Sequence, residues 1–150
     1  MGEGRDETEL ERYDRNLGEI LQELRVALPG VQVLFAFLLV VPFNDRFETV
    51  SRFESRVYFA TLLCTLFASI LLIAPSMIHR LRFRQGDKAF LVAVTNRLTI
   101  AGLTVFAIAL TGAVLLLTHF LYGPLTAAIT TGVVVIAFAV IWFAVPLARR

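Results

Sequence analysis

Three polar side chains stand where the first long apolar stretch begins, and they could bond to one another or to a passing solute. The stretch reads RVALPGVQVLFAFLL and starts at Arg25. An amide inside an apolar region needs hydrogen-bond partners, so Gln32 is expected to face other helices rather than lipid. One interpretation is a packing hydrogen bond from Gln32. The other is a cytoplasmic vestibule formed by Glu23, Arg25 and Gln32.

The proline and glycine of this stretch have separate expected roles. Pro29 is expected in the first turn of the span, where its missing N–H costs no intrahelical hydrogen bond. Gly30 would let a neighbouring backbone come close. In the vestibule interpretation, Pro29 and Gly30 shape its mouth.

A second polar pattern runs along the third apolar stretch. Its members recur every seven residues, which places them near one face of a helix: Arg97, Thr104, Thr111 and Thr118. Such a stripe is typical of a helix–helix contact seam, and it could also line a narrow polar path that begins at Arg97. The start of this third stretch allows two arrangements: one long helix crosses the membrane and protrudes, or a short interfacial helix bends into the span near Asn96.

Small residues indicate two further contact seams. The second stretch has two stripes with a spacing of four residues: Thr61, Thr65 and Ser69, and Ala60, Cys64 and Ala68. The fourth stretch has a small-xxx-small pair, Ala128 and Gly132. Both patterns favour close packing of helices in a membrane.

Four apolar stretches must position these side chains. Hydrophobic residues make up 57% of the 150 residues, and the stretches are too long and apolar for ordinary core helices. We place the spans at about 26–43, 57–78, 98–122 and 125–148. Since lipid forbids unpaired backbone groups, the expected fold is all-α, an integral membrane four-helix bundle over residues 26–150.

Residues 1–25 are expected to form a separate cytoplasmic, acidic amphipathic helix. One apolar stripe recurs there at intervals of three and four: Leu10, Tyr13, Leu17, Ile20, Leu21, Leu24 and Leu28. The polar face is acidic, unlike that of most membrane-surface helices. The stripe is therefore expected to dock on its own bundle or on another copy. The segment lacks the features of a signal peptide, so the first span is expected to remain as an anchor.

The basic residues predict the orientation in the membrane. Lys and Arg number four in the N-terminal segment, five in residues 79–97 and two in the tail, against three in the first loop. Because basic residues favour the cytoplasmic side, both termini are expected there. Aromatic residues are expected at both interfaces. The formal charge of +2 is distributed according to this topology and gives no reason to expect nucleic acid as a partner.

The sequence contains none of the spacings that mark common catalytic or cofactor sites. It has no GxSxG, no HExxH, no paired cysteines and no glycine-rich phosphate loop. His79 and His119 are expected as interfacial side chains at opposite faces of the membrane, where they cannot share one metal. We therefore expect no enzyme activity, no cofactor and no metal site.

Two segments carry a resemblance to a known group of proteins. ELRVALPGVQVLFAFLLVVPF, with its acidic amphipathic lead, and NRLTIAGLTVFAIALTG resemble an uncharacterised family of small four-span bacterial membrane proteins. The resemblance runs over most of the chain. It implies a bacterial plasma membrane, and members often carry a sodium:proton antiporter label.

The positions of the acidic residues argue against that label. All twelve Asp and Glu residues are expected outside the spans, with Asp45, Glu48 and Glu54 in the outer loop. A proton-coupled antiporter usually needs an intramembrane carboxylate that binds a proton and a cation in turn.

The sequence predicts a non-enzymatic membrane interaction or accessory protein. Its expected partners are the lipid bilayer, a second copy of the chain, or an unknown membrane or cytoplasmic protein. The main alternative is a small oligomeric channel or transporter for an ion or solute.

Overall fold

The computed structural model describes residues 9–82 and 88–148 and consists of helices over these ranges. The long elements are α1 (Glu9–Val40), α2 (Arg52–Arg82), α3 (Lys88–Tyr122) and α4 (Pro124–Phe138). Two short 3₁₀ turns, η1 (Val41–Phe43) and η2 (Asp45–Thr49), join α1 to α2. A π-helical segment (Ala139–Ala144) and α5 (Val145–Leu147) continue α4. The predicted all-α membrane bundle is confirmed.

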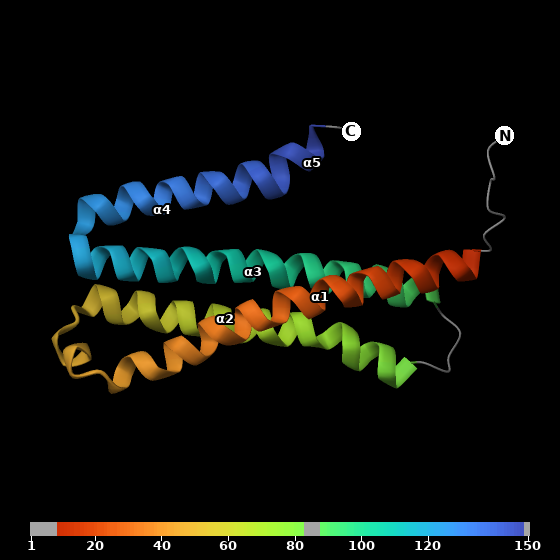
Figure 1. Cartoon of the computed structure of the whole chain (residues 1–150), viewed down its shortest axis with the longest axis horizontal. Helices are drawn as coiled ribbons and strands as arrows, with labels where there is room; N and C mark the ends of the chain where they lie inside the picture. The colour runs from red at the N-terminus through yellow and green to blue at the C-terminus, as the bar shows by residue number, and fades with distance from the viewer. Residues whose placement is uncertain (1–8, 83–87, 149–150) are drawn as a thin grey trace.

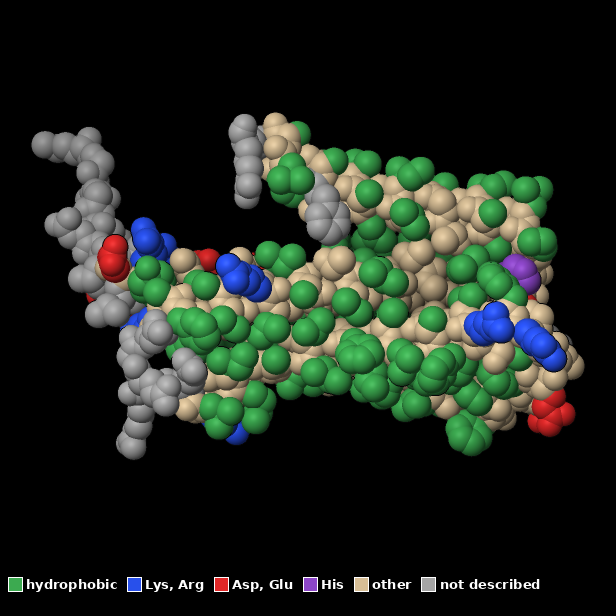
Figure 2. All heavy atoms as spheres, turned by 180° about the vertical axis from the view of Figure 1, so that it is seen from behind, with side chains coloured by type: hydrophobic (Ala, Val, Ile, Leu, Met, Phe, Trp, Pro, Cys, Tyr) green, Lys and Arg blue, Asp and Glu red, His purple; other side chains and the backbone are tan. Residues whose placement is uncertain are grey.

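Four helices are long and apolar enough to cross a membrane: Glu11–Phe43, Arg52–Leu81, Lys88–Tyr122 and Pro124–Leu147. On the face seen in Figure 2, hydrophobic side chains cover the middle of the molecule, and charged side chains gather towards its two ends. This distribution suits a hydrocarbon layer between two aqueous sides. The chain is a multi-pass membrane protein.

The helices are arranged around an antiparallel α2–α3 pair (Figure 1). α1 crosses this pair and contacts both helices, whereas α4 packs only on α3 among the described elements. At 1.5 Å per residue, the 32 residues of α1 and the 35 of α3 span about 48 and 52 Å, more than a hydrocarbon layer of about 30 Å. Both helices therefore extend beyond the membrane core.

The predicted N-terminal helix and the first span form one helix over the described residues. α1 continues through Pro29, which lies in its interior and not in a first turn as expected. The missing Pro29 N–H leaves the Arg25 carbonyl without its usual helical donor, and both residues lie on the exposed face. The sequence also predicts a helix N-cap at Asp87, a residue that lies outside those the structure describes.

The apolar stripe of α1 docks on its own bundle. Every seventh residue is buried: Leu17, Leu24, Val31 and Leu38. Leu24 and Val31 form a core with Ala68 and Leu72 of α2. The stripe predicted for residues 10–28 thus contributes Ile20, Leu21 and Leu28 to the same cluster.

Small residues bring α2 and α3 close together. A Cβ at Gly112 would collide with the Thr61 hydroxyl, and one at Gly102 would lie 2.6 Å from Leu72 Cδ2. Of the predicted Thr61, Thr65 and Ser69 stripe, Thr61 and Thr65 are buried and Ser69 is partly buried, as expected for a contact seam. Of the second predicted stripe only Ala68 is buried, whereas Ala60 is exposed. The Thr hydroxyls do not cross the interface, because each bonds a carbonyl four residues earlier in α2.

Candidate functional site

The connection between α1 and α2 builds a folded cap at one end of the bundle. Ser51 and Glu54 form a capping box at the start of α2: the Ser51 N–H donates to Glu54 Oε2 at 2.7 Å, and the Glu54 N–H donates to Ser51 Oγ at 3.2 Å. This reciprocal pair satisfies two amide groups that the helix itself leaves free. It also fixes the direction of the Glu54 side chain.

Glu54 is buried and reaches the far end of α3. Its Oε1 lies 3.1 Å from Nδ1 of His119, and the Phe53 ring lies 5.1 Å from the imidazole ring. Only 8% of Glu54 is exposed. Glu54 was expected in the outer loop, and this expectation is wrong. α2 begins at Arg52, and the capping box at its start turns the Glu54 carboxylate inward. The other two acids of this connection, Asp45 and Glu48, are exposed as expected.

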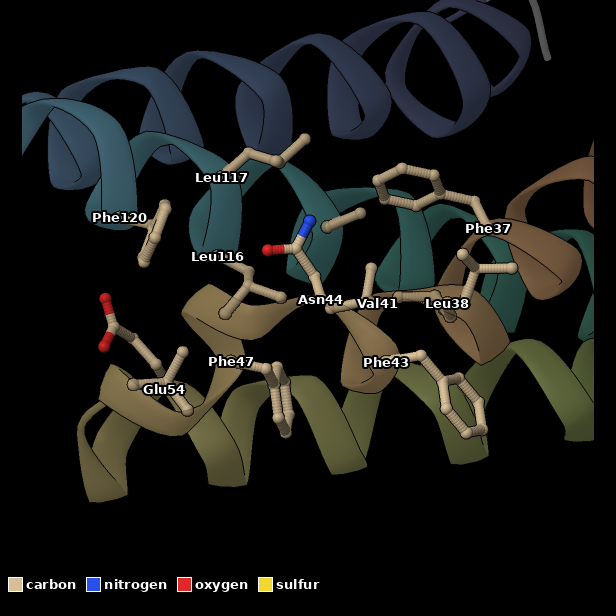
Figure 3. Close-up of a pocket in the computed structure, with 13 residues that line it drawn as sticks. Phe37, Leu38, Val41, Phe43, Asn44, Phe47, Glu54, Leu116, Leu117 and Phe120 are labelled. Atoms are coloured by element: carbon tan, nitrogen blue, oxygen red, sulfur yellow. The ribbon is translucent and has the colours of Figure 1, made fainter.

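Beside this pair lies an apolar cavity of about 460 Å³ (Figure 3). Its walls come from the end of α1, the η1–η2 connection and the second half of α3. Four of the lining residues are aromatic: Phe37, Phe43, Phe47 and Phe120. Figure 3 places the Glu54 carboxylate near Phe120 at one end of the cavity, with Phe37 and Phe43 towards the other. Glu54 is the sole charged residue among the lining residues. An apolar cavity with a single fixed charge is typical of a small-molecule site.

Two interactions hold the cap against the bundle. The Tyr58 hydroxyl donates to the Leu38 carbonyl at 2.8 Å in a buried hydrogen bond. The Phe47 ring packs edge-on against Tyr58 with centroids 5.2 Å apart. Leu38 and Phe47 both line the cavity, so its walls from α1 and η2 are tied to α2. The cavity is largely preformed.

The predicted vestibule residues do not come together in a pocket. Glu23, Arg25 and Gln32 are all exposed on the outer surface of α1. The expected burial of Gln32 against other helices is wrong, because the buried stripe passes through Val31 and the next residue turns about 100° away from it. The neighbouring backbone expected beside Gly30 is not among the atoms nearest to its Cβ position; the nearest is the Phe106 ring of α3 at 3.7 Å, an ordinary van der Waals distance.

The polar stripe of α3 is bonded within its own helix. Thr104, Thr111 and Thr118 donate to the carbonyls of Ile100, Ala107 and Val114 at 2.8, 2.8 and 2.6 Å. The Thr130 hydroxyl of α4 lies 3.3 Å from Thr118 Oγ1, but its shorter contact is with the Thr126 carbonyl of its own helix at 2.8 Å. These bonds favour the packing interpretation over a polar path, because each hydroxyl proton is already used.

Asn96 and Arg97 begin no separate helix. α3 runs unbroken from Lys88, so the alternative with one long helix is correct and the bend near Asn96 is wrong. Both side chains are exposed. The site that the structure does build was missed, although Ser51-Arg52-Phe53-Glu54 has the spacing of a capping box.

Comparison with known proteins gives a family and no activity. No curated protein and no solved structure matches the chain. The sequence model of DUF6328, a family of unknown function, matches residues 6–146. Because the match covers nearly the whole chain, this four-helix membrane protein belongs to DUF6328.

Proposed function

We propose that the protein is a non-enzymatic interaction or accessory protein of the bacterial plasma membrane, and that α4 is its docking helix for a second copy of the chain. The observation that carries this proposal is the position of α4, which contacts only α3 among the described elements. Its axis diverges from α3 towards the C-terminal end (Figure 1). A helix with one neighbour has most of its surface free for another.

The outward surface of α4 is apolar and exposed. Leu125, Ile129, Val133 and Ile136 are 60–75% exposed. Lipid alone can cover such a surface, so apolarity does not decide the partner. A protein partner is instead indicated by one flank of α4, where small side chains permit a close approach of another helix.

Ala128 and Gly132 lie on this flank, away from α3. Ala128 is exposed, and nothing lies within 4 Å of a Cβ placed at Gly132. The sequence predicts this pair as a contact seam, yet no described residue of the same chain packs against Gly132. Small-xxx-small pairs let two helices approach closely in lipid. A symmetric contact between two α4 helices would use the pair on both sides, and twofold dimers are the commonest closed assemblies.

Cysteine crosslinking in membranes tests this interface. Gly132→Cys in a Cys64→Ser background is expected to form a disulfide-linked dimer upon mild oxidation. Ala137→Cys is the matched control, because Ala137 is also small and exposed but lies on the opposite flank of α4. Equal crosslinking at both positions, or none at Gly132, would contradict the proposed interface.

The orientation belongs to the same proposal. The charge distribution supports cytoplasmic termini and an outer η1–η2 connection. Asp45→Cys and Glu19→Cys replace exposed side chains at the two ends. In intact cells an impermeant thiol reagent is expected to label only Asp45→Cys, and labelling of Glu19→Cys would reverse the topology.

A channel or transporter remains the alternative function and finds less support. It would require an oligomer with a continuous polar path, yet the Thr104 and Thr111 hydroxyls donate within α3. Liposomes loaded with a pH-sensitive dye test the antiport version directly. We expect no sodium-driven proton flux above that of empty liposomes.

A further inference from the structure

We propose that the cavity at the capped end of the bundle binds a lipophilic organic cation, with the Glu54 carboxylate as its counter-ion. The proposal does not depend on the α4 interface. It rests on the juxtaposition of one buried carboxylate with an aromatic, apolar cavity on the same end of the chain.

The carboxylate has capacity left for a ligand. Glu54 accepts one hydrogen bond from the Ser51 N–H and faces His119 Nδ1, whereas an ionised carboxylate offers about four acceptor positions. No Lys or Arg is among the residues that line the cavity. A cation is therefore the complementary ligand charge, and an anion would be repelled.

The walls suit the body of such a ligand. Phe37, Phe47 and Phe120 present aromatic rings, whose faces attract a cation in a desolvated site. Phe43 is 87% exposed, so this wall of the cavity borders the surroundings of the protein. The volume of about 460 Å³ lies within the usual range for drug-sized ligands. An apolar cation dissolved in the membrane interface can reach both the rings and the carboxylate.

A neutral apolar molecule fits the walls but adds no positive group to the Ser51 N–H and His119 that already face the carboxylate. Burying a carboxylate next to an apolar body costs free energy unless a positive group or further hydrogen bonds accompany it. The ammonium group of an aminolipid could also compensate the carboxylate, since such a lipid combines apolar chains with a positive charge. The experiment must therefore separate charge from apolarity, and a free cation from a lipid headgroup.

Equilibrium dialysis of the purified full chain with tetraphenylphosphonium tests the assignment. We expect saturable binding of this cation and no saturable binding of tetraphenylborate, which has the same shape and the opposite charge. Neutral triphenylphosphine oxide is expected to bind at least roughly tenfold more weakly. Equal binding of the cation and the neutral probe, or no saturable cation binding, would overturn the proposal.

Glu54→Gln is the decisive variant, because Gln keeps the volume and serves at the same position of a capping box. We expect its affinity for tetraphenylphosphonium to fall roughly tenfold or more, since the charge is lost. Glu48→Gln is the matched control: it removes an exposed carboxylate from η2 at the same end and should leave the affinity unchanged. Unchanged binding by Glu54→Gln would refute the counter-ion role.

A second variant tests the cavity without changing its charge. Ala113 lines the cavity from α3, and Ala113→Phe would fill part of the space. We expect this variant to lose cation binding while its circular dichroism and gel-filtration profile remain those of the unaltered chain. Should it misfold, Glu54→Gln still decides the proposal. Retained affinity in a folded Ala113→Phe protein would place the binding elsewhere.

Nanodiscs distinguish the two sources of positive charge. Both phosphatidylcholine and phosphatidylethanolamine are zwitterionic, but only the second carries a primary ammonium. Equal tetraphenylphosphonium affinity in the two lipids supports a free organic cation as ligand. A lower tetraphenylphosphonium affinity in phosphatidylethanolamine than in phosphatidylcholine supports the lipid ammonium as the resident cation, provided that this difference between the lipids is absent in Glu54→Gln.

Discussion

An acid–base pair joins distant parts of the chain at each end of the described bundle, and the two pairs differ in burial. At the capped end Glu54 lies 3.1 Å from His119, with 10% and 25% of their side chains exposed. At the other end Asp14 of α1 lies 2.6 Å from Lys88 of α3, with 60% and 37% exposed. The Asp14–Lys88 contact is the shorter of the two, and its side chains are also the more exposed to solvent. Distance alone therefore does not rank the two pairs, because solvent screens the exposed one.

The difference follows from how the helices end. At the capped end η1 and η2 fold back over α2, and the Tyr58 hydroxyl bonds the Leu38 carbonyl beneath them. At the other end α1 and α3 are long enough to pass beyond the membrane core, so their polar side chains meet in water. The comparison predicts that substitutions at the capped end cost stability and that those at the other end cost little.

The largest effect is expected for Glu54→Ala. The change removes the acceptor of the Ser51 N–H and the partner of the partly buried His119. We expect a loss of about 3 kcal/mol in the free energy of unfolding, from the lost cap and the unsatisfied groups together. Unfolding in mixed micelles measures it. Glu48→Ala is the control, and equal losses for both variants would show that Glu54 is not special.

Tyr58→Phe is expected to come next. It deletes the hydroxyl that bonds the Leu38 carbonyl and keeps the ring that packs on Phe47. A buried carbonyl left without its donor costs about 1–2 kcal/mol. Tyr122→Phe, at a position that is 71% exposed, should cost almost nothing in the same assay. If the two variants match, the hydrogen bond does not hold the cap.

Ser51→Ala is expected to cost about 1 kcal/mol, since it removes the side-chain half of the capping box and leaves the Glu54 half in place. Ser55→Ala is the control one turn further along α2, where Ser55 is exposed. Thermal denaturation in detergent, followed by circular dichroism, ranks the two. A larger loss for Ser55→Ala would contradict the assignment of the cap.

The sequence predicts the helices of this molecule well, because hydrophobic length is a local signal. The amphipathic stripe of residues 10–28 and the Thr61, Thr65 and Ser69 stripe are also periodic and local. The structure buries Leu17 and Leu24 of the first and Thr61 and Thr65 of the second. Gln32 shows the limit of that argument: its polarity says that it needs partners, but only the packing of Val31 decides which face of α1 points inward.

The candidate site was beyond such reasoning because its parts are far apart in the chain. Glu54 and His119 are 65 positions apart, and the cavity closes only when η1 and η2 fold over the end of α3. The charge count indicated an exposed loop at this end, and a charged residue is seldom fully buried unless it is paired. The capping-box spacing at Ser51 was the available signal, and it predicts a helix start there rather than a buried charge.

The smallest effect is expected at the other end, for Asp14→Asn. The substitution removes the charge that faces Lys88 and keeps nearly the same side-chain volume. Exposed ion pairs contribute about 0–1 kcal/mol, and this one is free to exchange its partner for water and salt. We expect a loss below about 0.5 kcal/mol that disappears in 1 M salt, where the screening length is about 3 Å. Unfolding in mixed micelles at low and high salt measures both values. A salt-independent loss as large as that of Glu54→Ala would mean that the two ends are equivalent. Burial would then not determine how much the Glu54–His119 and Asp14–Lys88 pairs contribute to stability.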